Sequence, residues 1–167
     1  MEKVKRSYLA HYLDAAFDMT FSKTNYVLIG DELEEFNVEL NPEIDATPNI
    51  LDELNVEHNG YQVSADADPF YYKYNDELSE KILGIAMDRL SGKDCRTSYV
   101  EVILKPGENG GKPIVDKAWR EEVVIVPNRY GGGSSGVQVP FTIHHTNKRV
   151  KGSFDLETKT FTENGAA

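Results

Sequence analysis

This chain of 167 residues is 40% hydrophobic and contains nine tyrosines and seven phenylalanines, which predicts one folded domain and excludes a disordered chain. Its formal net charge of −10 disfavours binding to a phosphate backbone, and its single cysteine, Cys95, excludes an intrachain disulfide. The first thirty residues lack a signal-peptide pattern, and no apolar run approaches the ~20 residues that span a bilayer. We therefore expect a soluble protein with no membrane partner.

The N-terminal part of the chain predicts a basic arm followed by two short strands. Three basic residues fall within residues 1–7, a pattern that is typical of a solvated tail and less often of an arm that docks on an acidic neighbour. An apolar run at 25–30 and an alternating run at 36–40 each predict a strand.

The segment that follows predicts an extended loop and a hairpin. Asn41 and Pro42 end the preceding strand, and residues 41–53 are mainly polar, so we expect a long loop, which in a compact domain usually has a function. The pair Asn59–Gly60 favours a type I′ turn, because both central residues of that turn need positive φ. This pair predicts a hairpin over residues 55–65.

The middle of the chain predicts one loop and one helix. Residues 66–74 form a loop that is dense in aromatic side chains, which favours a subunit interface or a hinge. Residues 76–90 have helical periodicity, with Asn75 or Asp76 as the N-cap and Gly92 as the end. The apolar face of this helix, expected to pack on a sheet, contains Leu78, Ile82, Ile85 and Leu90.

The C-terminal half predicts several strands and no further helix. Strands are expected at 99–104, 119–127, 137–146, 150–154 and 160–162, with turns at 105–113 and Asn147–Lys148. Since strands and helices do not alternate, a parallel sheet is not expected. The predicted fold is mainly β, an antiparallel β-sandwich or barrel with one flanking α-helix.

Several residue groups suggest chemistry, but each has a simpler interpretation. His144 and His145 are neighbours on a strand and point to opposite faces, so they cannot share a metal ion. The glycine-rich segment 107–112 has the wrong spacing for a phosphate loop and is followed by proline, so it predicts a hairpin turn. Turn and cap roles are favoured over a calcium site for Asp66, Asp68 and Asp76.

Three glutamates offer paired carboxylates of the kind that glycosidases use. Glu101, Glu121 and Glu122 lie on neighbouring predicted strands, and we expect them to supply surface or lumen charge rather than catalysis. The sequence therefore predicts no catalytic residue, no metal site and no cofactor, and we do not expect an enzyme.

The order and spacing of several short motifs carry a family resemblance. Together they resemble the major tail tube proteins of phages and prophages of low-GC Gram-positive bacteria, over residues 26–161. The motifs are YVLIG-x-x-L from Tyr26, VELNPEID-x-TPNIL from Val38, NGY from Asn59, DPFYY from Asp68, YVEVIL from Tyr99, YGGGSSGVQVPF from Tyr130 and VKGSFD-x-x-TKTF from Val150. One departure is Asn147, where the resemblance leads us to expect a glycine; asparagine also accepts positive φ.

The resemblance implies a structural virion protein made of one tail tube domain over residues 1–167. Six copies are expected to form a ring, and rings are expected to stack into a tube, located in the tail of the virion and assembled in the cytoplasm of the bacterial host. The implied partners are the chain itself, the tape measure, tail terminator and distal tail proteins, and DNA that passes without specific binding during ejection. A sheath is also compatible with it.

Within this interpretation, two sets of residues are candidates for function. We expect an acidic lumen, because a basic wall would hold DNA. The candidate lumen-facing residues are Glu35, Asn37, Glu39, Glu57 and Gln62. The candidate subunit or ring-stacking residues are Asn41, Pro42, Ile44, Pro48, Ile50, Leu51, Phe70, Tyr71 and Tyr72. Two alternatives stay open: the tube of a contractile bacteriocin or injection apparatus, and a non-viral β-sandwich binding module.

Overall fold

The computed structural model describes residues 1–165 and consists mainly of β-strands. The strands are β1 (Leu9–Asp14), β2 (Tyr26–Ile29), β3 (Val38–Glu39), β4 (Pro42–Pro48), β5 (Leu54–Tyr61), β6 (Ser64–Ala67), β7 (Arg96–Lys105), β8 (Ile114–Pro127), β9 (Phe141–Asp155) and β10 (Thr160–Glu163). The helix α1 spans Glu77–Met87, and short 3-10 turns lie at Arg6–Tyr8, Gly92–Cys95 and Glu108–Gly110. Within the described residues, no helix is long and apolar enough to cross a membrane.

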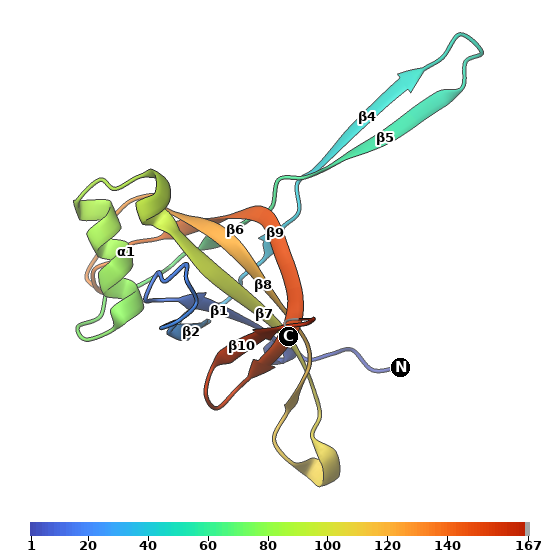
Figure 1. Cartoon of the computed structure of the whole chain (residues 1–167). Coiled ribbons are helices and arrows are strands. Elements are labelled where there is room, and N and C mark those ends of the chain that lie inside the picture. Colours follow the sequence, from blue (N-terminus) through green and yellow to red (C-terminus); the bar gives the residue numbers. More distant parts are fainter. Residues whose placement is uncertain (166–167) are drawn as a thin grey trace.

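The main sheet is antiparallel throughout and curls into a half-barrel (Figure 1). Its strand order is β2-β1-β7-β8-β9-β6-β3, and β10 pairs with the C-terminal half of β9. The predicted class, mainly antiparallel β with one flanking helix, is confirmed. β4 and β5 are not part of this sheet and form a separate two-stranded hairpin.

Both faces of the main sheet are covered, because alternate residues of its strands enter different apolar clusters. Leu13 and Tyr99 pack in a cluster with α1, whereas their neighbours Tyr12 and Val100 pack in a second cluster with Phe154 of β9. The predicted helix face is confirmed, since Leu78, Ile82 and Ile85 are buried; Leu90 was predicted with them but is 41% exposed.

The two ends of α1 differ in how well the sequence predicted them. Asp76 is the N-cap as expected, and its carboxylate accepts a hydrogen bond from the Ser79 amide at 3.4 Å. The helix ends earlier than Gly92: Arg89 takes φ +55, and the Leu90 amide donates to the Ile85 carbonyl at 3.0 Å. Arginine therefore occupies the left-handed position that is usually glycine.

β9 is one long strand, so the turn predicted at Asn147–Lys148 is wrong. At this position the strand contains a β-bulge opposite Glu121–Val123, and Asn147 has φ +65. Within the strand predicted at 137–146, burial alternates from Phe141, where β9 begins: Phe141, Ile143 and His145 are buried and His144 is exposed, whereas Val137 lies before the strand and is 49% exposed. The segment 107–112 connects β7 to β8, as the predicted hairpin turn requires.

The hairpin predicted at Asn59–Gly60 is also wrong, and so is the loop predicted at 41–53. Asn59 and Gly60 lie inside β5, and the true turn is residues 49–53 between β4 and β5. The side-chain oxygen of Asn49 accepts hydrogen bonds from the amides of Leu51 and Glu53 at 2.9 and 3.0 Å, which closes this turn. Gly60 uses its positive φ of 114° at an irregularity in the β4–β5 pairing instead.

Candidate assembly surface

The hairpin of β4, residues 49–53 and β5 projects from the body of the molecule; we call residues 42–61 the arm (Figure 1). Every residue of β4 is exposed, and β5 is exposed except for Gly60, which is half-buried. An isolated two-stranded hairpin is only marginally stable in water. The arm is thus the part of the fold that the core stabilises least.

The arm is amphipathic. The register pairs Ile44 with His58, Ala46 with Val56 and Pro48 with Leu54, and residues that pair directly share a face. The alternate pairs, Asp45 with Glu57 and Thr47 with Asn55, make the other face polar, and Pro42 pairs with Tyr61 at the base, beyond the irregularity in the register. We call these the apolar face and the polar face of the arm.

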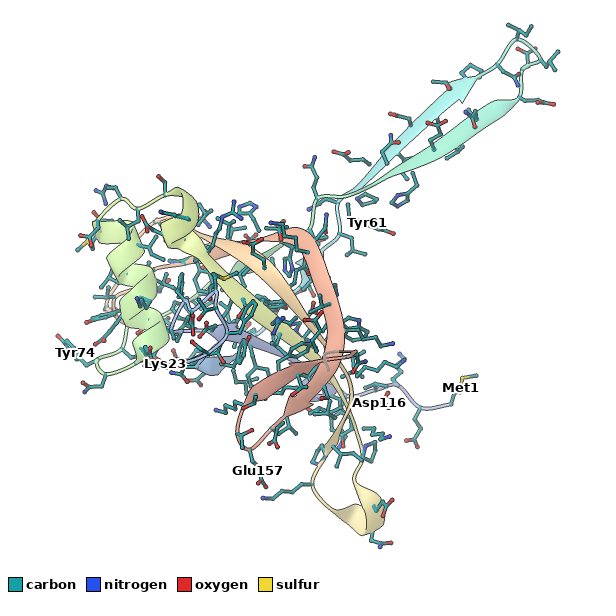
Figure 2. All side chains as sticks on the ribbon, in the orientation of Figure 1. Met1, Lys23, Tyr61, Tyr74, Asp116 and Glu157 are labelled. Carbon is teal, nitrogen blue, oxygen red and sulfur yellow. The ribbon has the colours of Figure 1, made fainter. Side chains whose placement is uncertain are left out.

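The apolar face is open to solvent along its length. Exposed fractions are 50% for Ile44, 65% for Leu54 and 57% for Val56, and at the tip they reach 99% for Ile50 and 72% for Leu51. Apolar side chains that share a face and lack a covering layer are characteristic of interaction sites. Figure 2 shows that the side chains of the arm extend from both of its faces, well away from the core.

The arm joins the body through hydrogen bonds to the backbone carbonyls around Tyr61. The Asn147 side chain donates a hydrogen bond to the Tyr61 carbonyl at 2.9 Å, and the His145 amide donates to the Val63 carbonyl at 2.9 Å. On the other strand, Asn41 takes φ +44 and its side chain donates to the Gln62 carbonyl at 2.9 Å. The bulge in β9 therefore holds the base of the arm.

A buried carboxylate holds this bulge in turn. Glu121, which is 3% exposed, accepts hydrogen bonds from His145 Nδ1 at 3.0 Å, from Arg149 at 2.9 Å and from the Asn147 amide at 2.9 Å. Arg149 also donates to Glu101 at 3.0 Å. Glu101 and Glu121 were predicted to be surface or lumen charges; they are instead buried, because each is paired with a cation.

The second part of this network involves the N-terminal basic segment, residues 1–7. Arg6 contacts His11 Nε2 at 3.1 Å and donates to the Phe36 carbonyl at 2.9 Å, so residue 6 is not part of a free tail. His11 Nδ1 lies 2.5 Å from the Tyr99 hydroxyl. Because a guanidinium only donates, Nε2 of His11 must be the acceptor, which requires a neutral imidazole.

The pKa values in this network follow from burial and pairing. The pKa of His11 is lowered to about 4, mainly by burial and in smaller part by the nearby Arg6 and His145. Burial opposes ionisation of Glu121, but hydrogen bonds from His145, Arg149 and the Asn147 amide outweigh it, so the pKa of Glu121 is lowered. Burial raises the pKa of Tyr99 well above its usual range. At neutral pH, Glu121 is therefore an anion and His11 is neutral.

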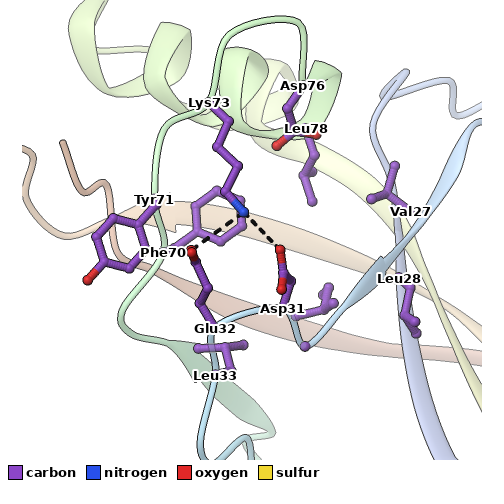
Figure 3. Close-up of a pocket in the computed structure, with 12 residues that line it drawn as sticks. Val27, Leu28, Asp31, Glu32, Leu33, Phe70, Tyr71, Lys73, Asp76 and Leu78 are labelled. Carbon is purple, nitrogen blue, oxygen red and sulfur yellow. Dashed lines mark hydrogen bonds and ion pairs between the residues drawn. The ribbon is translucent and has the colours of Figure 1, made fainter. Parts of the chain in front are cut away.

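The aromatic candidates for the interface lie on the body rather than on the arm. Phe70 packs edge-on against Phe141, with ring centroids 4.9 Å apart, so it belongs mainly to the core. Tyr71 and Tyr72 are half-buried. Phe70 and Tyr71 line a cleft with Lys73, whose amine lies 2.8 Å from Asp31 and 3.5 Å from Glu32 (Figure 3). The structure thus separates these aromatic residues from the candidates at 41–51.

The candidate lumen residues are all exposed, but the structure does not bring all of them together. Glu35 and Asn37 are joined by a hydrogen bond of 2.6 Å, and Glu39 lies on β3. Glu57 lies on the polar face of the arm, and the Gln62 side chain donates to Glu43 at the arm's base. Sequence reasoning missed Leu54 and Val56 as interface candidates, although their alternation with polar neighbours was a usable signal.

The residue groups first considered for metal chemistry have other partners. Asp76 caps α1, Asp68 pairs with Arg129 at 3.1 Å, and Asp66 accepts a hydrogen bond from Thr142 at 2.6 Å. Glu122 pairs with Arg96 and Lys148, both at 3.0 Å. Among residues 1–165, no group of three His, Cys, Asp or Glu side chains is placed to hold a metal ion.

In comparisons with known proteins, no family model matches this chain and no curated protein sequence matches it.

Proposed function

We propose that this chain is a structural subunit that assembles with copies of itself into stacked six-membered rings and forms the tail tube of a phage. The observation that carries the proposal is the arm: a hairpin with one mainly apolar face, exposed along its length in the single chain. A face of this kind is expected to be covered in the working protein, and a second copy is always available during assembly.

The ends of the main sheet support the same proposal. The sheet ends at β2 and β3, two edges where another strand can pair. Pairing of such edges between copies closes a curled sheet into a ring, and closure removes the exposed edges. The arm then provides a second, separate contact, which suits stacking of one ring on the next. The resemblance described above supplies the number six and the implied partners, namely other tail proteins and a sheath where one is present.

For the interior of the tube we propose an acidic wall. Glu35, Asn37 and Glu39 form one exposed group on the body, and we assign them to the lumen together with Glu57 and Gln62 near the arm. A duplex carries about one charge per 1.7 Å of axis. Like charge on the wall keeps a layer of water and counterions between the two surfaces, so that DNA passes without binding.

Sedimentation velocity over a range of protein concentrations tests the proposal. We expect species much larger than the 18.8 kDa monomer at high concentration. A chain that stays monomeric at all concentrations would favour the alternative of a β-sandwich binding module.

Virions that carry Glu39→Lys and Glu57→Lys test the lumen separately, because these changes should leave tubes intact and slow DNA ejection, more so at low salt. Ejection at the normal rate would remove the lumen assignment alone. Ejection also separates a phage tube from the tube of a bacteriocin, which has no DNA cargo.

A further inference from the structure

The charge of the chain is strongly segregated along the sequence. Residues 24–72 contain twelve Asp and Glu residues and no Lys or Arg, whereas the whole chain has a net charge of −10. The rest of the chain is therefore slightly positive. The arm lies inside this acidic segment, and its tip, residues 49–53, carries Asp52 and Glu53 beside the exposed Ile50 and Leu51.

Lysines gather at a different part of the molecule. The register places Lys117 opposite Ile103 and Leu9 opposite the same residue, so β1 begins beside the β7–β8 hairpin. Lys151 of β9 pairs with Trp119, which lies two residues after Lys117 on β8. The exposed lysines of this region, which we call the lysine end, are Lys3, Lys5, Lys105, Lys112, Lys117 and Lys151. Acidic residues lie in the same region as well, and one of them, Asp116, is held 3.5 Å from Lys105.

An open apolar groove adjoins the lysine end; we call it the β1 groove. Its apolar lining includes Leu9, Ala10, Tyr12, Leu28 and Leu104, and one basic and one acidic residue, Arg6 and Glu34, also line it. Leu9 is 38% and Leu28 is 53% exposed. Leu9 pairs with Ile103, which in turn pairs with Lys117, so the groove and the lysine end adjoin. The tip of the arm has the complementary composition, with two exposed apolar side chains next to two carboxylates.

The arm cannot reach the lysine end of its own chain. It projects away from the body, whereas Asp116 lies on the body, well away from its tip (Figure 2). A contact between the two surfaces must therefore join two copies. Because the surfaces differ, the contact is heterologous and leaves one arm and one lysine end free, so that it can repeat.

We propose that the tip of the arm of one copy docks on the lysine end of a second copy, with Ile50 and Leu51 in the β1 groove and the carboxylates of the tip facing the lysines. This inference rests on the proposed function, since it assigns the surface that receives the arm. Buried apolar side chains supply affinity, and complementary charge sets the register and the rate of association.

Charge reversal with rescue tests the charged part of the contact. One variant carries Asp52→Asn and Glu53→Lys, where asparagine preserves a residue that accepts the φ of +61 at position 52. A second variant carries Lys112→Glu and Lys117→Glu. At low ionic strength each should raise the concentration for half-assembly by about tenfold or more, because like charges then face each other. An equimolar mixture, or one chain with all four changes, should recover to within about threefold of the unmodified protein.

The control variant carries Lys23→Glu and Lys93→Glu, two exposed lysines outside the lysine end, and should change half-assembly by no more than about twofold. If the unmodified protein assembles and neither reversal affects it, the docking site is wrong while the proposed function stands. The same conclusion follows if both reversals weaken assembly but the mixture does not recover. If the unmodified protein never assembles, both proposals fail.

Crosslinking tests the apolar part of the contact. A chain with Leu51→Cys is mixed with a chain with Leu28→Cys, and a short bismaleimide is added; Cys95 is buried and serves as the background. We expect a crosslinked dimer only in this mixture. Met87→Cys, a 55% exposed position on α1, replaces Leu28→Cys in the control. Equal yields from the two mixtures would remove the β1 groove as the receiving surface.

Discussion

Glu121 shows how one buried side chain positions the candidate assembly surface. Its carboxylate accepts from the Asn147 amide, and the Asn147 side chain binds the carbonyl of Tyr61 at the base of the arm. His145 and Arg149 keep the carboxylate ionised in spite of its burial. A buried ion pair adds little net stability over an apolar pair, but it fixes geometry, because its partners cannot move without leaving a charge unpaired.

Replacing Glu121 by Gln should therefore be costly. We expect the free energy of unfolding in urea to fall by about 2–4 kcal/mol, since Arg149 loses a buried partner and the Asn147 amide loses an ionised acceptor. Glu122→Gln is the matched control, because Glu122 is half-buried and pairs with the exposed Lys148; its cost should stay within about 1 kcal/mol. Equal losses for the two variants would contradict the role of Glu121.

His11 predicts how stability depends on pH. Its pKa is lowered from 6.5 to about 4 in the folded chain, so the unfolded chain binds a proton first as the pH falls. The contribution of His11 to the free energy of unfolding is fully present above pH 6.5. It is lost as the pH falls to about 4, and the loss amounts to at most ~3 kcal/mol. The pKa of Glu121 is also lowered in the folded chain, so protonation of Glu121 further reduces the free energy of unfolding once the pH falls below 4.5, the usual pKa of this carboxyl.

The variant His11→Gln separates the two groups. It should flatten the pH dependence of the unfolding free energy between pH 6.5 and about 4 and leave the decline at lower pH. Denaturant unfolding at a series of pH values gives this comparison directly. An unchanged slope between those values in the variant would show that His11 does not cause it.

Among the elements, the C-terminal hairpin depends on a glycine. A Cβ on Gly152 would overlap the Thr162 carbonyl oxygen and lie 2.5 Å from the Phe161 ring. Gly152→Ala should therefore loosen the pairing of β9 with β10 and cost about 1–3 kcal/mol, measured by thermal unfolding. The control, Ser153→Ala, changes an exposed neighbour and should cost less than about 0.5 kcal/mol. Wild-type stability for Gly152→Ala would contradict the close packing.

The arm should matter for assembly and not for the fold of the single chain. Ile50→Ser with Leu51→Ser removes the two most exposed apolar side chains of the tip. The unfolding free energy should change by less than about 0.5 kcal/mol, because neither side chain contacts the core. Sedimentation should show assembly weakened by about tenfold or more. Thr47→Ser on the polar face is the control and should assemble like the unmodified protein. If the tip variant also assembles like the unmodified protein, the role of the tip is contradicted.

The elements also show what the sequence could and could not predict. Alternation on β9 and the helical period of α1 predicted both elements, because their apolar faces pack on the core. β1 was missed, since His11 and Asp14 are buried with polar partners and break the apolar pattern. The arm was misplaced because Asn59–Gly60 favours a turn locally, whereas the pairing of Pro48 with Leu54 places the turn at residues 49–53.

On the scale of the whole molecule, the candidate site was only partly predictable. The apolar candidates at 44–51 do lie on one exposed element, as a stacking contact requires, but Phe70 belongs to the core. The sequence could not show that Glu101 and Glu121 are buried, because their partners Arg149 and His145 come from a strand that joins them only in the folded sheet. The segregation of charge between the arm and the lysine end is visible in the sequence, but its meaning depends on the register of β1, β7 and β8.

Electron microscopy of the purified, concentrated protein in negative stain tests the central claim most directly. We predict rings with a central hole and six-fold symmetry in averaged end views, together with stacks of these rings in side views. The tip variant Ile50→Ser with Leu51→Ser should give few or no stacks in the same buffer. Fields that contain only single particles of the size expected for an 18.8 kDa chain, at every concentration, would contradict self-assembly and with it the proposed tube.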